Sequence, residues 1–182
     1  MLHYQHRVSK DIDIFIDDLQ YLGLITPRLN PWFGIDEGSY DETAHYIKLR
    51  YSEGEIDFIV SHALSDAPQT TFCFRGRELP IETPAEIALK KLYHRAEGLK
   101  PRDIFDIAVV LSSENDTKEL ERQLAVLEPV KSALTDRLAR LPDPYYQAAL
   151  AELDVTPPWE PIKARARSMV ENLVRTIPSA AR

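Results

Sequence analysis

Acidic residues alternate with apolar ones in the segment DIDIFIDD, residues 11–18. Asp11 and Asp13 flank Ile12, so in an extended chain both carboxylates point to the same side. Two residues of a strand span about 6–7 Å. Carboxylates at that separation can both reach metal ions held ~3.5–4 Å apart, the spacing of a two-metal phosphoryl-transfer site. The alternative is that Ile12 and Ile14 face the core while the aspartates merely face water.

A further carboxylate, Asp57, lies between apolar residues in the segment EIDFIV, residues 55–60. An aspartate within an apolar strand is costly if it is buried without a partner. As a third metal ligand beside Asp11 and Asp13 it would be neutralised, and the alternative is an exposed strand position. An Asp-x-Asp on one strand combined with a single Asp on a neighbouring strand is a more specific signal for a metal site than either part alone.

Basic residues follow in the second half of the chain. Lys91 lies in TPAEIALKKLYHR and can offset the charge of a triphosphate, although a plain surface lysine fits the same pattern. Arg102 and Asp106 stand four residues apart in PRDIFD, on one face of a helix. They form either a simple helix salt bridge, or a group that holds Lys91 or a substrate in place.

The elements that would position these residues fall into two groups. Before residue 83, alternating patterns predict strands. A short helix is expected through LQYLGLI, and RLNPWFGIDEGSYDET is expected to be irregular. Thr83-Pro84-Ala85-Glu86 predicts a helix start with a capping box. The fold class is therefore α+β, with a small mixed sheet unit (1–95) followed by a helical region (96–182). The predicted strands are 11–16, 44–51, 55–60, 71–74 and 78–82, and the predicted helices after Thr83 are 101–111, 116–128, 130–141, 145–153 and 160–175.

Composition excludes several classes of function. No stretch approaches the length of a membrane span, and the one cysteine, Cys73, excludes an internal disulfide and indicates a reduced, cytoplasmic setting. A net charge of −7 argues against nonspecific coating of DNA. The sequence has no Walker or Rossmann glycine motif and no clustered His/Cys set for zinc.

Taken together, RVSKDIDIF, EIDFIV, TPAEIALKKLYHR and PRDIFDIAVVL resemble the AbiEii-type nucleotidyltransferase family, toxins of abortive-infection and type IV toxin–antitoxin systems. The resemblance covers residues 1–112. It implies a nucleotidyltransferase unit of the polymerase-beta-like superfamily. The implied reaction is attack of an acceptor hydroxyl on the α-phosphate of a nucleoside triphosphate. The implied partners are a tRNA or protein acceptor and an antitoxin, with no DNA or membrane.

The resemblance also implies roles for individual residues. Asp11, Asp13 and Asp57 would be the catalytic carboxylates and would bind Mg²⁺ or Mn²⁺. The other implied residues would bind the substrate, with Lys91 on its phosphates. They are Arg7, Ser9, Lys91, Arg102, Asp103 and Asp106.

One feature of the family is missing from the segment before Asp11. Relatives carry a Gly-Gly or Gly-Ser turn roughly ten residues before the Asp-x-Asp, where backbone amides hold the phosphates. MLHYQHRVSK contains no glycine, and residues 1–6 are expected to be the end of the helix that follows that turn. The expected explanation is that the native protein starts upstream of Met1, and the alternative is a shortened member of the family.

Three hypotheses remain at this point. The first is a metal-dependent nucleotidyltransferase. The second is a binding or regulatory module that keeps the fold without the chemistry. The third is a hydrolase or nuclease that uses the same carboxylates, although Asp57-Phe58-Ile59 lacks the acid and lysine spaced two apart that a restriction-type nuclease places on this strand.

Overall fold

The computed structural model of the chain describes residues 2–179. It contains two compact units, and each is described by itself. We call residues 9–62 the sheet unit, and residues 1–8 together with 63–182 the helical unit. The hairpin after His62 and the start of the chain thus belong with the helices.

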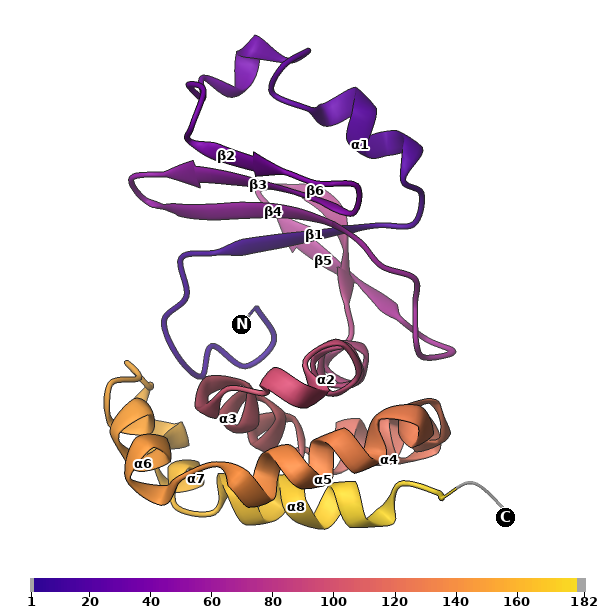
Figure 1. Cartoon of the computed structure of the whole chain (residues 1–182), viewed down its shortest axis with the longest axis vertical. Coiled ribbons are helices and arrows are strands. Elements are labelled where there is room, and N and C mark those ends of the chain that lie inside the picture. The colour runs from indigo at the N-terminus through magenta and orange to yellow at the C-terminus, as the bar shows by residue number, and fades with distance from the viewer. Residues whose placement is uncertain (1, 180–182) are drawn as a thin grey trace. The chain divides into compact units, whose positions relative to one another are not determined.

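The sheet unit is a four-stranded mixed sheet in the strand order β1-β4-β3-β2 (Figure 1). Strands β1 and β4 are parallel, and the other two pairings are antiparallel. The hairpin expected around Ser52–Gly54 joins β3 to β4. The segment expected to be irregular contains a 3₁₀ turn and the edge strand β2, so that expectation was wrong in part. The elements are β1 (Ile12–Ile16), α1 (Gln20–Ile25), η1 (Pro31–Phe33), β2 (Tyr40–Glu42), β3 (Tyr46–Tyr51) and β4 (Gly54–Val60).

Alternation gives this sheet one apolar face and one polar face. Ile47 and Leu49 of β3 are fully buried beside Leu22 of α1, and Phe58 of β4 packs against them. Ile12 and Ile14 lie on the edge strand β1 and remain 55% and 38% exposed, so they do not reach a core in the described chain. The polar residues of β1, β3 and β4 therefore share the other face.

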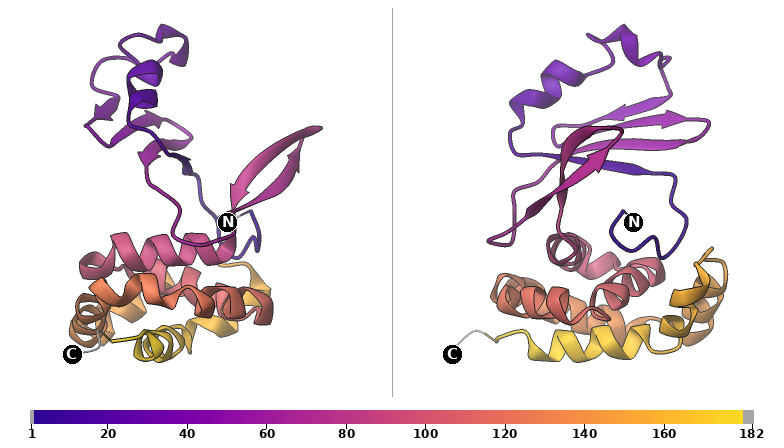
Figure 2. Two further views of the ribbon diagram at one scale, coloured as in Figure 1. Left: turned by 90° about the vertical axis from the view of Figure 1, so that its right-hand side faces the viewer. Right: turned by 180° about the vertical axis from the view of Figure 1, so that it is seen from behind.

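The helical unit contains a two-stranded hairpin and a bundle of helices, and Figure 2 shows the hairpin projecting from the helices. Helix α3 lies at the centre of the core, where Ile104, Phe105 and Ile107 are fully buried. The elements are β5 (Gln69–Phe74), β6 (Arg77–Glu82), α2 (Pro84–His94), η2 (Ala96–Gly98), α3 (Pro101–Val110), α4 (Glu114–Arg122), η3 (Leu124–Val130), α5 (Lys131–Arg140), α6 (Asp143–Ala151), η4 (Pro157–Trp159), α7 (Glu160–Lys163) and α8 (Ala166–Thr176).

The helix signals are confirmed at α2, with one correction. The Thr83 hydroxyl accepts a hydrogen bond from the Glu86 amide, and Pro84 is the first helical residue. The fully buried Glu86 carboxylate does not close a capping box. It accepts hydrogen bonds from the amides of Leu64 (2.9 Å) and Ser65 (2.8 Å), while the Thr83 amide donates to Pro68 O. Glu86 therefore fixes the chain that leads into the hairpin.

Two predicted helices are broken in the structure. The helix expected over 116–128 ends at Arg122 and continues as the 3₁₀ segment η3, which contains Pro129. The helix expected over 160–175 is divided between α7 and α8. No described helix is long and apolar enough to cross a membrane.

The start of the chain is not helical, which corrects the expectation for residues 1–6. Residues 2–4 form a turn, Met1 lies outside the described residues, and residues 5–8 contain only a single β-bridge residue, Arg7. His6 O accepts a hydrogen bond from the Thr156 amide (3.0 Å), and the Val8 amide donates to Asp154 O (2.9 Å). Arg7 and Val155 form an antiparallel bridge. These bonds hold residues 6–8 against the helical unit.

Candidate functional site

A row of charged side chains crosses the polar face of the sheet unit, and we call it the charged row. Asp13 of β1 lies opposite Asp57 of β4, Asp57 lies opposite Lys48 of β3, and Lys48 lies opposite Asp41 of β2. Paired positions on neighbouring strands point to the same face. The strand register therefore places two predicted carboxylates side by side with a lysine next to them.

Lys48 is tightly held by two carboxylates. Its ammonium lies 2.9 Å from Asp57 Oδ2 and 2.6 Å from Glu55 Oε2. Partial burial lowers the pKa of Lys48, but the hydrogen bonds to Glu55 and Asp57 outweigh burial and raise it above its ordinary value. Lys48 is therefore a permanent cation that offsets negative charge in the row.

The second oxygen of Asp57 has no hydrogen-bond partner among the described residues. Asp57 Oδ1 is buried and accepts no hydrogen bond from any described residue. A buried carboxylate oxygen without a partner loses hydration that nothing replaces. Because carboxylate oxygens are the ligands that hard divalent cations prefer, this atom fits a metal ligand.

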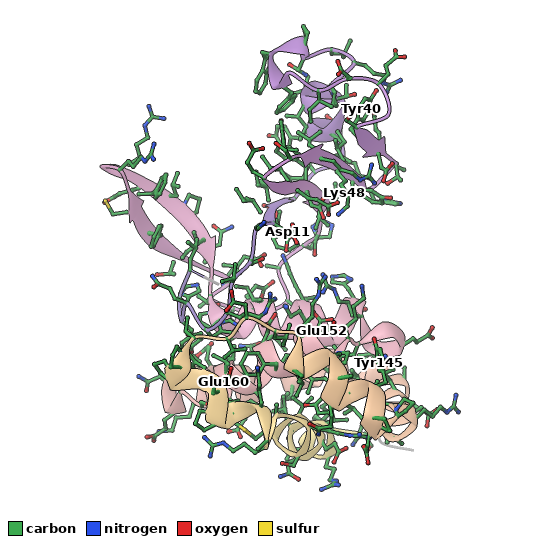
Figure 3. All side chains as sticks on the ribbon, turned by 90° about the vertical axis from the view of Figure 1, so that its left-hand side faces the viewer. Asp11, Tyr40, Lys48, Tyr145, Glu152 and Glu160 are labelled. Atoms are coloured by element: carbon green, nitrogen blue, oxygen red, sulfur yellow. The ribbon has the colours of Figure 1, made fainter. Side chains whose placement is uncertain are left out.

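Asp11, labelled in Figure 3, lies just before β1 and two residues before Asp13. Its Oδ1 accepts a weak hydrogen bond from the Glu55 amide, with 3.4 Å between the two atoms. Across residues 2–179, no three or more His, Cys, Asp or Glu side chains converge on one point. The structure thus brings Asp13 and Asp57 to adjacent positions, while Asp11 is directed at the β4 backbone.

Asp106 is the centre of a buried ion-pair network in the helical unit, which we call the Asp106 cluster. Its Oδ1 accepts from Arg7 Nε (2.6 Å) and pairs with His6 Nε2 (2.9 Å), while its Oδ2 accepts from Lys91 Nζ (2.5 Å) and Arg7 Nη2 (2.8 Å). Burial raises the pKa of Asp106, but the bonds from Arg7 and His6 and the charge of Lys91 hold that pKa well below its usual value. Asp106 therefore ties the start of the chain to α2 and α3.

Asp103 completes the Asp106 cluster one turn earlier on α3. It is fully buried, and its Oδ1 accepts from Arg95 Nη1 (2.7 Å) and Lys91 Nζ (3.2 Å). Three cations, Arg7, Lys91 and Arg95, thus face two carboxylates. With His6 left out of the count, the cluster therefore has a net charge of +1.

Arg102 and Ser9 lie outside these groups. Arg102 does not form the helix salt bridge with Asp106 that the four-residue spacing allows, because Asp106 is turned inward toward Arg7 and Lys91. The Arg102 side chain is exposed and pairs with no described carboxylate, and it lines a pocket near the start of α3. Ser9 is exposed on the sheet unit.

Three residues of these groups were not identified from the sequence. Lys48 could have been found from the turn at Ser52–Gly54, since a two-residue connection sets Tyr51 against Gly54 and hence Lys48 against Asp57. Arg95 follows Lys91 by one helical turn, which is a weak signal for a shared partner. His6 gave no local signal, because its partner is 100 residues away.

Comparison with known proteins gives one match. The family model described as nucleotidyl transferase AbiEii toxin, type IV toxin–antitoxin system, matches residues 1–181. No curated protein and no solved structure matches the chain. The match extends well beyond the motifs in residues 1–112 and includes the whole helical region.

Proposed function

Because the chain belongs to the AbiEii nucleotidyl transferase toxin family of type IV toxin–antitoxin systems, we propose that it transfers a nucleotide from a nucleoside triphosphate to a macromolecular acceptor, tRNA or protein, with its sheet carboxylates as the metal-dependent centre. The family implies a nucleoside triphosphate as substrate and an antitoxin as partner. The observation that carries the proposal is the charged row, where Asp13 and Asp57 are adjacent and Asp57 Oδ1 is buried without a hydrogen-bond partner in residues 2–179.

The carboxylates of Asp11, Asp13 and Asp57 would hold Mg²⁺ or Mn²⁺. A divalent cation there supplies positive charge to the triphosphate and lowers the pKa of an attacking hydroxyl. The orphaned Asp57 oxygen supports this set, since a cation would satisfy it. Asp11 would be the ligand that has to give up its weak hydrogen bond to the Glu55 amide before it binds the cation.

Lys48 acts as a positioning residue for Asp57. It holds one carboxylate oxygen at 2.9 Å, which leaves the other oxygen for the cation. Its charge also reduces the repulsion between Asp13 and Asp57, which stand at paired positions with like charge. This role does not require Lys48 to touch the substrate.

The cations of the Asp106 cluster are proposed to serve the substrate phosphates. Arg7 and Lys91 are held in fixed positions by Asp106, and Lys91 also by Asp103. Fixed cations stabilise developing negative charge better than mobile ones, because no reorganisation is needed during the reaction. The surplus positive charge of the cluster supports this assignment. Ser9 and Arg102 remain predicted substrate contacts.

The test compares Asp57→Asn with the wild-type chain. Each protein is incubated with Mn²⁺, α-³²P-labelled nucleoside triphosphates and total RNA or protein, and label on the macromolecule is counted. Asp57→Asn should lower transfer by about 100-fold, the range found when a ligand or one stabilising group is removed. The matched control is Asp136→Asn, which removes the same charge from an exposed aspartate outside the charged row and should leave transfer within about twofold.

Other outcomes of this assay overturn the proposal. Wild-type transfer retained in Asp57→Asn, with circular dichroism unchanged, removes the charged row from the chemistry. Release of labelled free nucleotide without a labelled acceptor indicates a hydrolase. Growth inhibition in cells that is equal for the wild type and Asp57→Asn indicates a binding module.

A further inference from the structure

A basic pocket opens on the helical unit, beside the Asp106 cluster. Its volume is about 610 Å³, within the ~300–1,000 Å³ that small-molecule sites occupy. Tyr93, His94 and Arg95 line it from the end of α2, and Lys100 and Arg102 from the start of α3. The lining also includes apolar residues of η3 and α5, where residues 129, 130 and 133 are Pro, Val and Ala.

Two of the three cations that line the basic pocket have no carboxylate partner within the described chain. Lys100 and Arg102 are exposed and pair with no described carboxylate, and Glu97 is the acidic residue of the lining. Arg95 is 41% exposed and shares the Asp103 carboxylate with Lys91. In a chain of net charge −7, two unpaired cations beside Arg95 at one pocket indicate an anionic ligand.

Aromatic rings give the pocket a second kind of contact. The rings of Tyr93 and His94 lie edge to face, with centroids 5.2 Å apart and planes at 80°. Burial and the positive charges of Lys90 and Arg95 lower the pKa of His94, so at neutral pH its ring is an uncharged aromatic surface. Cations beside aromatic and apolar surface are the combination that binds single-stranded nucleic acid, because phosphates pair with the cations and bases stack on the rings.

The pocket is directly connected to a predicted substrate-binding residue. Arg95 lines the pocket and binds Asp103 Oδ1, and the same oxygen binds Lys91. An acceptor strand that contacts Arg95 in the pocket would therefore be linked to Lys91 through the Asp103 carboxylate. Arg102, which the sequence linked to Asp106, belongs to this pocket instead.

We propose that the basic pocket binds an unpaired segment of an RNA acceptor, with Lys100 and Arg102 on its phosphates and Tyr93 against a base. This inference rests on the proposed function and selects RNA over protein as the acceptor. The pocket's charge and aromatic surface favour RNA, since a protein acceptor would need acidic side chains in place of a regular phosphate backbone.

The experiment measures RNA binding without catalysis. Fluorescein-labelled, unfractionated tRNA is titrated with protein in EDTA, without nucleoside triphosphate, and anisotropy is followed at several salt concentrations. The double variant Lys100→Ala/Arg102→Ala should weaken binding at least tenfold at low salt. It should also reduce the slope of log K against log salt by about 1.4–1.8, since each lost phosphate contact removes about 0.7–0.9.

The matched control is Lys118→Ala/Arg122→Ala on α4. It removes the same charge from exposed cations that already pair with Glu114 and Glu119, so tRNA binding should stay within about twofold. Circular dichroism verifies that both double variants are folded.

Each result decides between outcomes. Equal tRNA affinity for the wild type and the Lys100→Ala/Arg102→Ala variant overturns the inference, as does a wild type that labels protein and binds no tRNA. If Asp57→Asn keeps transfer activity while the pocket variant loses tRNA binding, the proposed metal centre fails and the RNA site stands. If the reverse holds, the metal centre stands and the RNA site fails.

Discussion

Asp106 is the buried carboxylate that pairs with Arg7, Lys91 and His6 in the helical unit. The substitution Asp106→Asn keeps the shape of the side chain and removes its charge. Arg7 and Lys91 then lose a carboxylate at 2.6 and 2.5 Å, and their side chains are only 12% and 18% exposed. Breaking a buried ion pair on one side costs about 3–5 kcal/mol, because the remaining charges stay buried without compensation. Lys91 keeps Asp103 at 3.2 Å, so we expect the lower end, about 3 kcal/mol.

The assay is urea unfolding followed by the helical circular dichroism signal at pH 7. With a slope of about 2 kcal/mol per molar urea, a loss of 3 kcal/mol lowers the midpoint by about 1.5 M. The control is Asp136→Asn, which breaks an exposed pair with Arg140 at 3.8 Å within α5 and should not shift the midpoint measurably. A midpoint shift for Asp106→Asn no larger than that of the control would refute the assignment of Asp106 as the structural centre of its cluster.

Three further predictions concern pH, backbone contact and metal affinity. The pKa of Asp106 is lower in the folded chain, so its stabilisation is present above about pH 4 and is lost as the pH falls through the folded pKa. The difference in unfolding free energy between wild type and Asp106→Asn should therefore shrink below pH 4 in urea titrations. Gly54→Ala places a Cβ 2.2 Å from Lys10 O and should cost about 1–3 kcal/mol in thermal melts, whereas Gly23→Ala meets nothing within 4 Å and should not destabilise α1. Lys48→Met removes a cation from the charged row and should tighten Mn²⁺ binding by up to about tenfold in calorimetry.

Contrary results for these predictions are equally specific. A constant stability difference from pH 7 to pH 3 would show that the Asp106 carboxyl titrates alike in both states. Equal melting temperatures for Gly54→Ala and Gly23→Ala would show that the β3–β4 turn relaxes freely. Unchanged Mn²⁺ binding by Lys48→Met would show that the cation does not share the environment of Lys48, and weaker binding would show that the lost positioning of Asp57 outweighs the removed charge.

Local pattern predicted most elements because the periodicity of a strand or helix is contained in adjacent residues. The alternation in 11–16 and 55–60 gave β1 and β4, and Thr83-Pro84 gave the start of α2. The break between α7 and α8 and the strand β2 were missed. In both cases the local pattern was compatible with another structure, and packing decided between them.

The same division applies to the candidate site. The sequence by itself predicted that Asp11 and Asp13 share a face, and it showed that Asp57 interrupts an apolar strand and which family the chain resembles. Only the tertiary structure decided that Lys48 sits against Asp57 and that Asp106 binds His6 and Arg7. It also decided that Arg102 faces a pocket of its own. The physical reason is that local spacing fixes the direction of a side chain, whereas its partner is fixed by strand register and helix packing over distances of up to 100 residues.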